Sequence, residues 1–214
     1  MNTNIKTVAK LAAFAGAFAL TGCAFVPDTV HSTYTPPANV TKVPGADKVV
    51  VDLIVKNEKK HKDGQVSWIK NGYDMDAAGV YMHVSKDFKD AFDKALSAHG
   101  FRLGANGDRA VDVVIHGFFI RESNQWSGIY DSGFSNVLVQ VKNQNGNILF
   151  SKDFHVDMKK TKEVDPFGGL SEGQHKSASQ FLSLIVDKIT SDRGFLTSLT
   201  PKSDKSGLVV PYIR

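Results

Sequence analysis

Hydrophobic residues occur along the chain in runs that predict the strands of a sheet. Residues 49–55 are mostly β-branched and apolar, which is typical of a buried strand. Residues 111–120 and 133–141 are two further apolar runs, which we expect to be strands joined by a polar loop. Residues 148–158 alternate irregularly between apolar and polar positions, and the Asn-Gly step at 145–146 predicts a tight hairpin before them. These runs predict a mostly antiparallel sheet.

Apolar residues at helical spacing predict a first helix between Ser85 and Gly100. We expect Ser85 to be its N-cap, Asp87 to lie in the first turn and Gly100 to end the helix. The buried stripe is predicted to consist of Phe88, Ala91, Phe92, Ala95 and Leu96.

A second helix is predicted to begin near Ser171. Ser171 is expected to be its N-cap, because Gln174 three positions later completes a capping-box pattern, and Gly194 is expected to end the helix. The buried stripe is predicted to consist of Ala178, Phe181, Leu182, Ile185 and Ile189.

The order of these elements, β-α-β-β-β-α, predicts an α+β fold. We expect a two-layer sandwich in which two helices cover one face of a mostly antiparallel sheet. The folded domain is predicted to cover residues 48–200, followed by a tail at 201–214 that either adds an edge strand or stays mobile. Residues 56–79 form a long polar excursion, which is interpreted either as a β-hairpin or as a path over the sheet edge.

The N-terminal residues have the pattern of a secretory signal. Lys6 and Lys10 precede an uncharged apolar run at residues 11–20, which is shorter than the roughly 20 residues of a permanent membrane span. Leu20-Thr21-Gly22-Cys23 then resembles the lipobox of bacterial lipoproteins. That resemblance implies that residues 1–22 are cleaved and that Cys23 carries a covalent diacylglycerol and an N-acyl chain.

The residues around Cys23 also indicate a location and limit the chemistry. Ala24 resembles the outer-membrane export pattern of such lipoproteins, since an Asp at that position would favour retention in the inner membrane. We therefore expect a lipid anchor on the periplasmic face of the outer membrane. Cys23 is the only cysteine, which excludes an intramolecular disulfide, a thiolate metal cluster and a second, catalytic thiol.

Residues 23–47 differ in composition from the rest of the chain, because they are rich in proline and small polar residues. They contain Pro27, Pro36, Pro37 and Pro44 and show no helical period. We interpret them as an extended tether that holds the domain away from the membrane. The alternative is that part of the segment packs along the domain as an irregular strand.

The charge balance does not require a nucleic-acid partner. The chain has 26 Lys and Arg against 22 Asp and Glu, and removal of Lys6 and Lys10 with the signal reduces the net charge from +4 to +2. Secretion argues further against a nucleic-acid partner. With 42% hydrophobic and 22% charged residues, the composition is that of an ordinary globular domain.

Motifs that would indicate catalysis or metal binding lack their required context. Residues 169–173 match G-x-S-x-G around Ser171, but Pro166 and the nearby glycines exclude the strand that a nucleophile elbow needs. Residues 74–79 begin like a calcium loop, yet Ala78 and Ser85 occupy ligand positions 5 and 12. None of the seven histidines has a metal-binding spacing. We therefore expect no catalytic residue, no metal and no cofactor other than the lipid on Cys23.

Two aromatic residues are the candidates for a partner surface. Trp126 and Tyr130 lie in the polar, glycine-containing stretch between two predicted strands, where neither has a periodic place in a buried face. Aromatic residues are enriched at interface anchors. We expect Trp126 and Tyr130 to contact an envelope protein that the sequence does not identify.

Several segments together resemble a known family. Residues 88–101 (FKDAFDKALSAHGF), the hydrophobic strand after them and Gln144-Asn145-Gly146-Asn147 between two strands resemble the YajG-type family of uncharacterised Gram-negative lipoproteins. The resemblance covers roughly residues 23–199, and the excursion at 56–79 and the tail depart from it. It implies an outer-membrane location and an α+β fold, and it brings no catalytic activity.

Together these features predict a non-enzymatic outer-membrane lipoprotein that binds or assembles with envelope components. One alternative is a structural subunit of an envelope machine or ring. Another is an accessory protein that carries a lipid or glycolipid in an apolar groove between the sheet and the helices.

Overall fold

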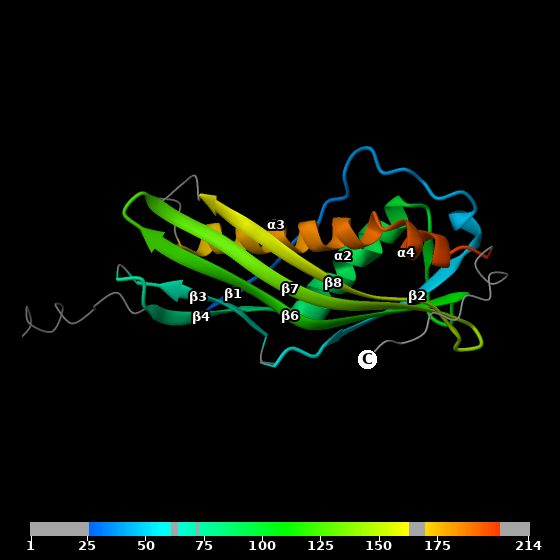
Figure 1. The fold of residues 1–214 in the computed structure, drawn as a ribbon, viewed down its shortest axis with the longest axis horizontal. Coiled ribbons are helices and arrows are strands. Elements are labelled where there is room, and N and C mark those ends of the chain that lie inside the picture. Colours follow the sequence, from blue (N-terminus) through cyan, green and yellow to red (C-terminus); the bar gives the residue numbers. More distant parts are fainter. Residues whose placement is uncertain (1–25, 61–63, 72, 163–169, 202–214) are drawn as a thin grey trace, which may run out of the picture.

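The structure is a computed structural model that describes residues 26–60, 64–71, 73–162 and 170–201. The predicted lipidation site Cys23 and the predicted tail after residue 201 lie outside the described residues. The described chain is elongated, with strands running along most of its length (Figure 1). None of the described helices is both long and apolar enough to cross a membrane.

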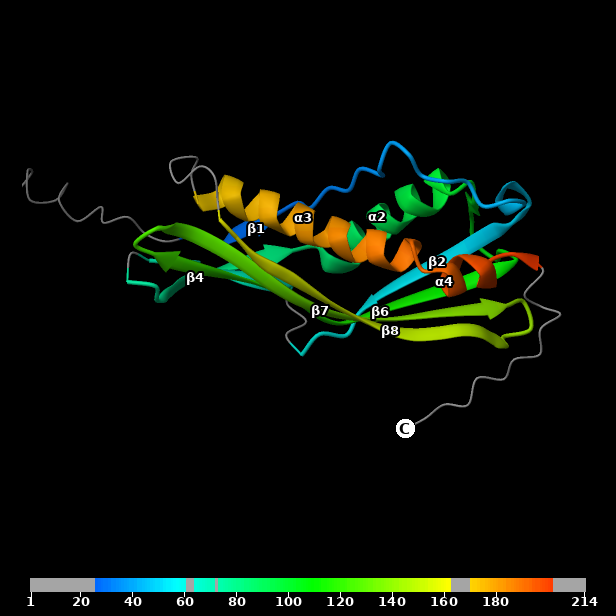
Figure 2. The same cartoon turned by 45° about the horizontal axis from the view of Figure 1, so that its top comes forward.

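A five-stranded sheet forms one layer of the molecule. In order across the sheet, its strands are β5 (Arg102–Leu103), β2 (Val50–Asn57), β6 (Arg109–Gln125), β7 (Gly128–Asn143) and β8 (Ile148–Lys162). β2 pairs in parallel with β5 and β6, whereas β6, β7 and β8 pair antiparallel. The helices α2 (Val84–Ala98), α3 (Leu170–Thr190) and α4 (Arg193–Ser198) lie on one side of the strands (Figure 2). The predicted α+β two-layer sandwich is confirmed.

A β-bulge in β6 keeps its apolar residues facing the helices. Val111, Val113 and Ile115 are fully buried at odd positions, and the pairing with β7 then shifts register between Ile115 and Gly117. After the shift, Phe118 and Ile120 are buried at even positions. Because side chains alternate along a strand, one inserted residue moves the buried face from odd to even positions.

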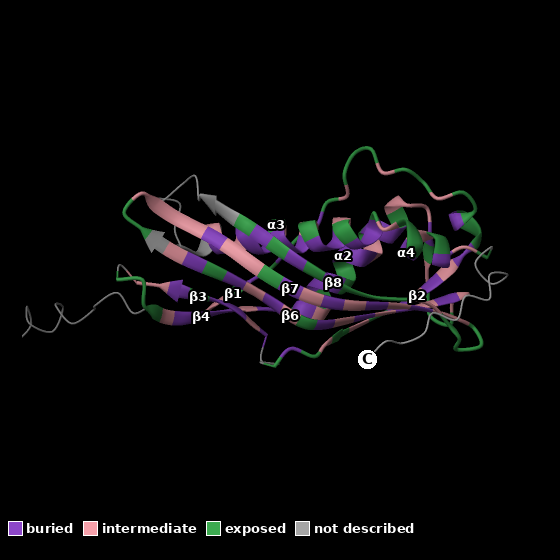
Figure 3. Cartoon of the chain, viewed as in Figure 1, coloured by how far each residue is buried: buried purple, intermediate pink, exposed green. Residues whose placement is uncertain are grey.

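The core is formed by the two predicted helical stripes and the sheet face below them. All five predicted residues of each stripe are buried, as Figure 3 shows for the inner sides of α2 and α3. The ring of Phe118 on β6 contacts Phe88 of α2 edge-on, with 5.4 Å between centroids, and stacks on Phe181 of α3 at 5.1 Å. These three rings join both helices to the sheet.

The structure contains a second, three-stranded sheet that was not predicted from the sequence. Its order is β1 (Asp28–Val30), β4 (Asp76–Met82) and β3 (Gln65–Lys70). β3 and β4 form an antiparallel hairpin within the polar excursion at residues 56–79, which confirms the hairpin alternative for that segment. β1 pairs in parallel with β4 and comes from the predicted tether.

The expectation of a free tether up to residue 47 is wrong for the part that the structure describes. Val30, Tyr34 and Ala46 are at most 3% exposed, and the Tyr34 hydroxyl donates a hydrogen bond of 2.7 Å to Asp187 of α3. Prolines prevent a helix in this segment, but they allow extended chain that follows a surface. The segment therefore packs along the domain as an irregular strand, and the packed part of the described chain begins with β1 at Asp28 rather than at Lys48.

The start of α2 differs from the prediction, whereas its end agrees with the prediction. The helix begins at Val84 and its N-cap is His83, so Ser85 lies inside the first turn and is not the cap. Val84 is 2% exposed, so burial of this residue sets the start of the helix. At the other end, Gly100 has φ 97° and the N–H of Phe101 donates to the carbonyl of Leu96, which is the expected glycine stop.

The second helix begins near Ser171 as predicted, but the cap role of Ser171 and the end at Gly194 are corrected. α3 begins at Leu170, so Ser171 is inside the helix, and Gln174 donates its amide N–H to Glu122 of β6 instead of completing a capping box. The helix ends at Thr190. Asp192 then adopts an extended conformation and accepts the N–H of Phe195, which starts α4 and places Gly194 inside it.

The prediction of a polar loop between residues 120 and 133 is also wrong. β6 and β7 continue through it as paired strands, with Ser123 opposite Tyr130 and Gln125 opposite Gly128. Only residues 126–127 form the turn, and Gly128 has φ 134°, a value that favours glycine. Backbone pairing needs no apolar side chains, so the hydrophobic pattern did not indicate these strand ends. The second predicted hairpin, at residues 144–147, joins β7 to β8 as expected.

Candidate functional site

Two hairpin turns and the start of β1 lie toward the same end of the molecule (Figure 1). The β6–β7 turn, the β3–β4 turn and the start of β1 are all at the left in Figure 1. Since β1 is parallel to β4, with Asp28 opposite Val80, the chain before β1 runs toward the start of β4 at Asp76. We call this region the tip end and define it by Val26, Tyr73, Met75 and Trp126.

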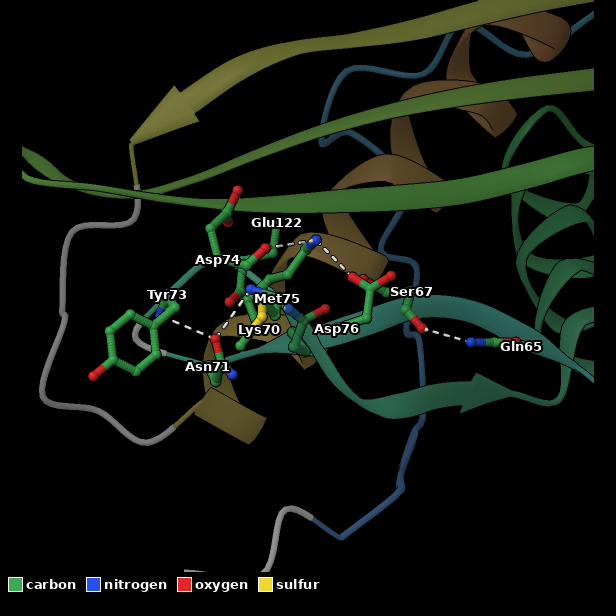
Figure 4. A network of polar contacts seen from close by, with 10 residues as sticks. Gln65, Ser67, Lys70, Asn71, Tyr73, Asp74, Met75, Asp76 and Glu122 are labelled. Atoms are coloured by element: carbon green, nitrogen blue, oxygen red, sulfur yellow. Dashed lines mark hydrogen bonds and ion pairs between the residues drawn. The ribbon is translucent and has the colours of Figure 1, made fainter.

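The four residues of the tip end are apolar or aromatic and point into solvent. The exposed fraction is 101% for Trp126, 87% for Tyr73, 67% for Val26 and 57% for Met75. Figure 4 shows the β3–β4 turn next to β6 and Glu122, with the Tyr73 ring pointing away from the strand. Trp126 follows Glu122 by four residues, or about 13 Å of strand. Exposed apolar side chains from three separate segments are thus gathered at one end, which is typical of an interaction surface.

The β3–β4 turn is held rigid by one asparagine. The side-chain oxygen of Asn71 accepts the backbone N–H groups of Tyr73 (2.9 Å) and Met75 (3.0 Å), and Asp74 has φ 59° (Figure 4). Lys70 forms an ion pair of 2.6 Å with Asp76 at the base of the turn. This side-chain-to-backbone bonding is the usual function of asparagine in turns, and it keeps Tyr73 and Met75 presented outward.

Trp126 and Tyr130, the two predicted partner residues, have different environments. Trp126 occupies the turn itself with its side chain fully exposed. Tyr130 lies on β7, partly buried, and its hydroxyl is 3.0 Å from the hydroxyl of Ser127, so it also stabilises the turn. Trp126 is therefore the better contact residue of the pair, and the use of either residue as a partner surface stays a prediction.

Two buried acids fix the outer half of this hairpin to α3. Glu122 and Asp131 are opposite each other in the β6–β7 pairing and are 3% and 4% exposed. Gln174 donates to Glu122 and Ser177 donates to Asp131. Burial raises the pKa of Asp131 above its ordinary value, and the hydrogen bond from Ser177 opposes that shift.

Sequence reasoning missed these acids, although a signal for them exists. Glu122 follows Phe118 and Ile120 at a spacing of two, which is the alternation of one strand face. The hydrogen bonds of these two acids join the β6–β7 pair to α3. In the part of the chain that the structure describes, no group of three or more His, Asp or Glu side chains is placed to hold a metal ion.

No family model matches the chain, and a comparison with curated proteins gives no match. Among solved structures, a protein from Xanthomonas campestris of the family DUF330 aligns with 81% of this chain and 99% of its own, with a TM-score of 0.52 and 14% identity. A minor lipoprotein from Acinetobacter baumannii aligns over 65% of this chain and 87% of its own, with a TM-score of 0.37 and 15% identity. A lipoprotein from Neisseria meningitidis aligns over 61% and 95%, with a TM-score of 0.34 and 9% identity. The first likeness supports the α+β fold.

Proposed function

We propose that this chain is a non-enzymatic lipoprotein, anchored through Cys23 to the periplasmic face of the outer membrane, whose tip end contacts the membrane surface. The observation that carries the proposal is the position of β1. Its pairing with β4 begins at Asp28, five residues after Cys23. Five residues of extended chain span at most about 18 Å. Acyl chains on Cys23 would therefore hold the domain against the bilayer with no long tether between them.

The composition of the tip end supports contact with lipid. Trp and Tyr are enriched at the membrane–water interface, where an apolar ring and a polar edge are both satisfied. Trp126 and Tyr73 are exposed on rigid turns at the end where the anchor attaches. The surface that the sequence assigned to an envelope protein thus lies where the membrane itself is nearest. The resemblance to YajG-type lipoproteins supports the same location.

Lipidation is tested by metabolic labelling with radioactive palmitate in a Gram-negative host. We expect the wild-type chain to be labelled and Cys23→Ser to be unlabelled, because a hydroxyl does not replace the thiol in lipid transfer. Ala24→Asp is the matched control, since it keeps Cys23: we expect it to retain the label but to fractionate with the inner membrane. Label on Cys23→Ser would contradict the anchor.

Membrane contact is tested by quenching of tryptophan fluorescence with brominated lipids. The chain has two tryptophans, Trp68 on β3 and Trp126 in the turn. Lipidated protein in brominated vesicles should be quenched, and quenching should survive in Trp68→Phe but be lost in Trp126→Phe. If Trp126 is not quenched, the tip end is free of lipid. A stoichiometric complex that dissociates in Trp126→Ala would then favour the protein-partner or ring-subunit alternative.

A further inference from the structure

A groove lies at the end of the molecule opposite the tip end. It is bounded by residues 34–48, which cross the C-terminal parts of α2 and α3, and by α4 (Figure 1). Its volume is about 1270 Å³. Pockets for small molecules commonly measure roughly 300–1,000 Å³, so this groove has room for a ligand with a long chain.

The floor of the groove is mostly apolar. Val40 and Val43 contribute from the N-terminal segment, and Leu184 and Leu196 contribute from α3 and α4. Leu184 is 43% exposed, although the neighbouring apolar residues of α3 are buried. An exposed leucine inside a concave apolar surface gains free energy when a hydrocarbon chain covers it.

The rim of the groove is positively charged. Lys42, Lys48 and Arg193 line it and are exposed, and the ammonium of a fourth lining residue, Lys188, donates to the carbonyl oxygen of His155 on β8. Among the described lining residues, Asp187 is the acidic one. The carboxylate of Asp187 accepts the hydrogen bond from Tyr34, so it is engaged within the protein. Three exposed cationic side chains around an apolar floor complement a ligand with one hydrocarbon chain and one anionic group.

We propose that this groove binds a single-chain anionic amphiphile of the fatty-acid type. The ligand must leave the anchoring membrane to reach the groove, because the groove and Val26 are at opposite ends. One acyl chain binds a bilayer reversibly, whereas two hold a molecule there stably, so a single-chain ligand exchanges through water. The C-terminal segment 202–214 is a poor occupant, since it carries Lys202, Lys205 and Arg214 against Asp204. The choice of a single-chain ligand rests on the proposed membrane anchoring, whereas the groove and its charged rim do not.

The test uses the full-length protein in phosphatidylcholine nanodiscs and a 16-carbon fatty acid with a photoactivatable diazirine in its chain. After irradiation, labelled peptides are mapped by mass spectrometry. We expect label within residues 40–48 and 184–196. Lys42→Gln with Lys48→Gln should raise the half-saturating concentration about thirtyfold, because two charges opposite an anion are lost. Lys86→Gln with Lys89→Gln is the matched control, because these lysines lie on α2 outside the groove and pair with Asp90 and Asp93.

A second probe separates charge recognition from apolar binding. The fatty alcohol with the same diazirine chain should label the groove more weakly, and its labelling should not depend on Lys42 or Lys48. If the alcohol and the acid label the groove equally, the groove does not recognise an anionic group. The same holds if the two lysine changes leave labelling by the acid unchanged. Label confined to the tip end would overturn the groove as a binding site. If the groove is labelled only after deletion of residues 202–214, the C-terminal segment occupies the groove in the full-length chain, and the proposal is overturned.

Discussion

Replacement of Tyr34 tests whether the N-terminal segment is part of the folded domain. Tyr34 is 3% exposed, and its hydroxyl donates to Asp187, 153 residues away in sequence. If residues 26–47 were a tether, a change at Tyr34 would leave the stability of the domain unchanged. In the structure, Tyr34 instead joins the segment to α3.

The magnitudes follow from what each substitution removes. Tyr34→Phe keeps the ring and loses a hydrogen bond to a charged group, which contributes about 1.5–3 kcal/mol. Asp187 is only partly buried, so water can solvate it again, and we expect a loss of about 1–2 kcal/mol. Tyr34→Ala also removes a buried aromatic ring and should cost about 3–5 kcal/mol.

The pH dependence adds a second signature. Burial and then the hydrogen bond to Asp187 raise the pKa of Tyr34 above its ordinary value. The folded state therefore keeps this proton at a pH where the unfolded chain releases it. Stability from this tyrosine is fully present below the ordinary tyrosine pKa of about 10 and is lost as the pH rises above it. Tyr34→Phe should remove that alkaline loss.

The assay is equilibrium denaturation in urea, followed by circular dichroism, with thermal unfolding alongside. Each 1 kcal/mol should lower Tm by about 2–4 °C in a domain of this size. Tyr73→Ala is the matched control, because Tyr73 is 87% exposed and its loss should change stability by less than about 0.5 kcal/mol. If Tyr34→Ala is as stable as the control, the segment does not pack on the domain and the reasoning fails.

Two further predictions concern the core and the buried acids. Phe92→Ala and Phe181→Ala should each lower the free energy of unfolding, measured in urea, by about 3–5 kcal/mol, because both rings are fully buried. Phe134→Ala is the control and should lower it less, because Phe134 is half-exposed. Equal losses at all three sites would contradict the assigned helix faces. Burial raises the pKa of Asp131, so the folded state binds a proton more tightly than the unfolded chain, and the free energy of unfolding should fall as the pH rises above the ordinary carboxyl range. Asp131→Asn should flatten this dependence, because the amide does not titrate in this range. An unchanged pH profile in Asp131→Asn would show that another group is responsible.

Local sequence patterns predicted those parts of the fold whose cause is local. The stripes of α2 and α3 were predicted residue by residue, because helical spacing alone places such residues on one side. The stop at Gly100 was predicted because a left-handed residue favours glycine. The N-caps were not predicted, since α2 begins at Val84 and α3 at Leu170, so Ser85 and Ser171 lie inside the helices.

The candidate site was predicted only in part. Trp126 was singled out because it has no place in a periodic pattern, and the structure places it at an exposed turn. Its relation to Val26, Tyr73 and Met75 was not predictable, since these residues meet at one end only through the pairing of β1 with β4 and the length of the β6–β7 hairpin. The groove has the same origin, because its walls come from residues 34–48 and from α2, α3 and α4, which follow much later in the chain.

By itself, the sequence determined the signal and lipobox pattern, the α+β class, the hairpin at residues 144–147 and the residues of the helical stripes, because each depends on neighbours within a few positions. Only the tertiary structure decided that the proline-containing segment packs on the domain, that polar strands extend to Trp126 and that Glu122 and Asp131 are buried. Polar or proline-rich chain becomes ordered when a distant surface supplies its hydrogen-bond partners and covers its few apolar residues. That surface exists only after the helices and the sheet have come together.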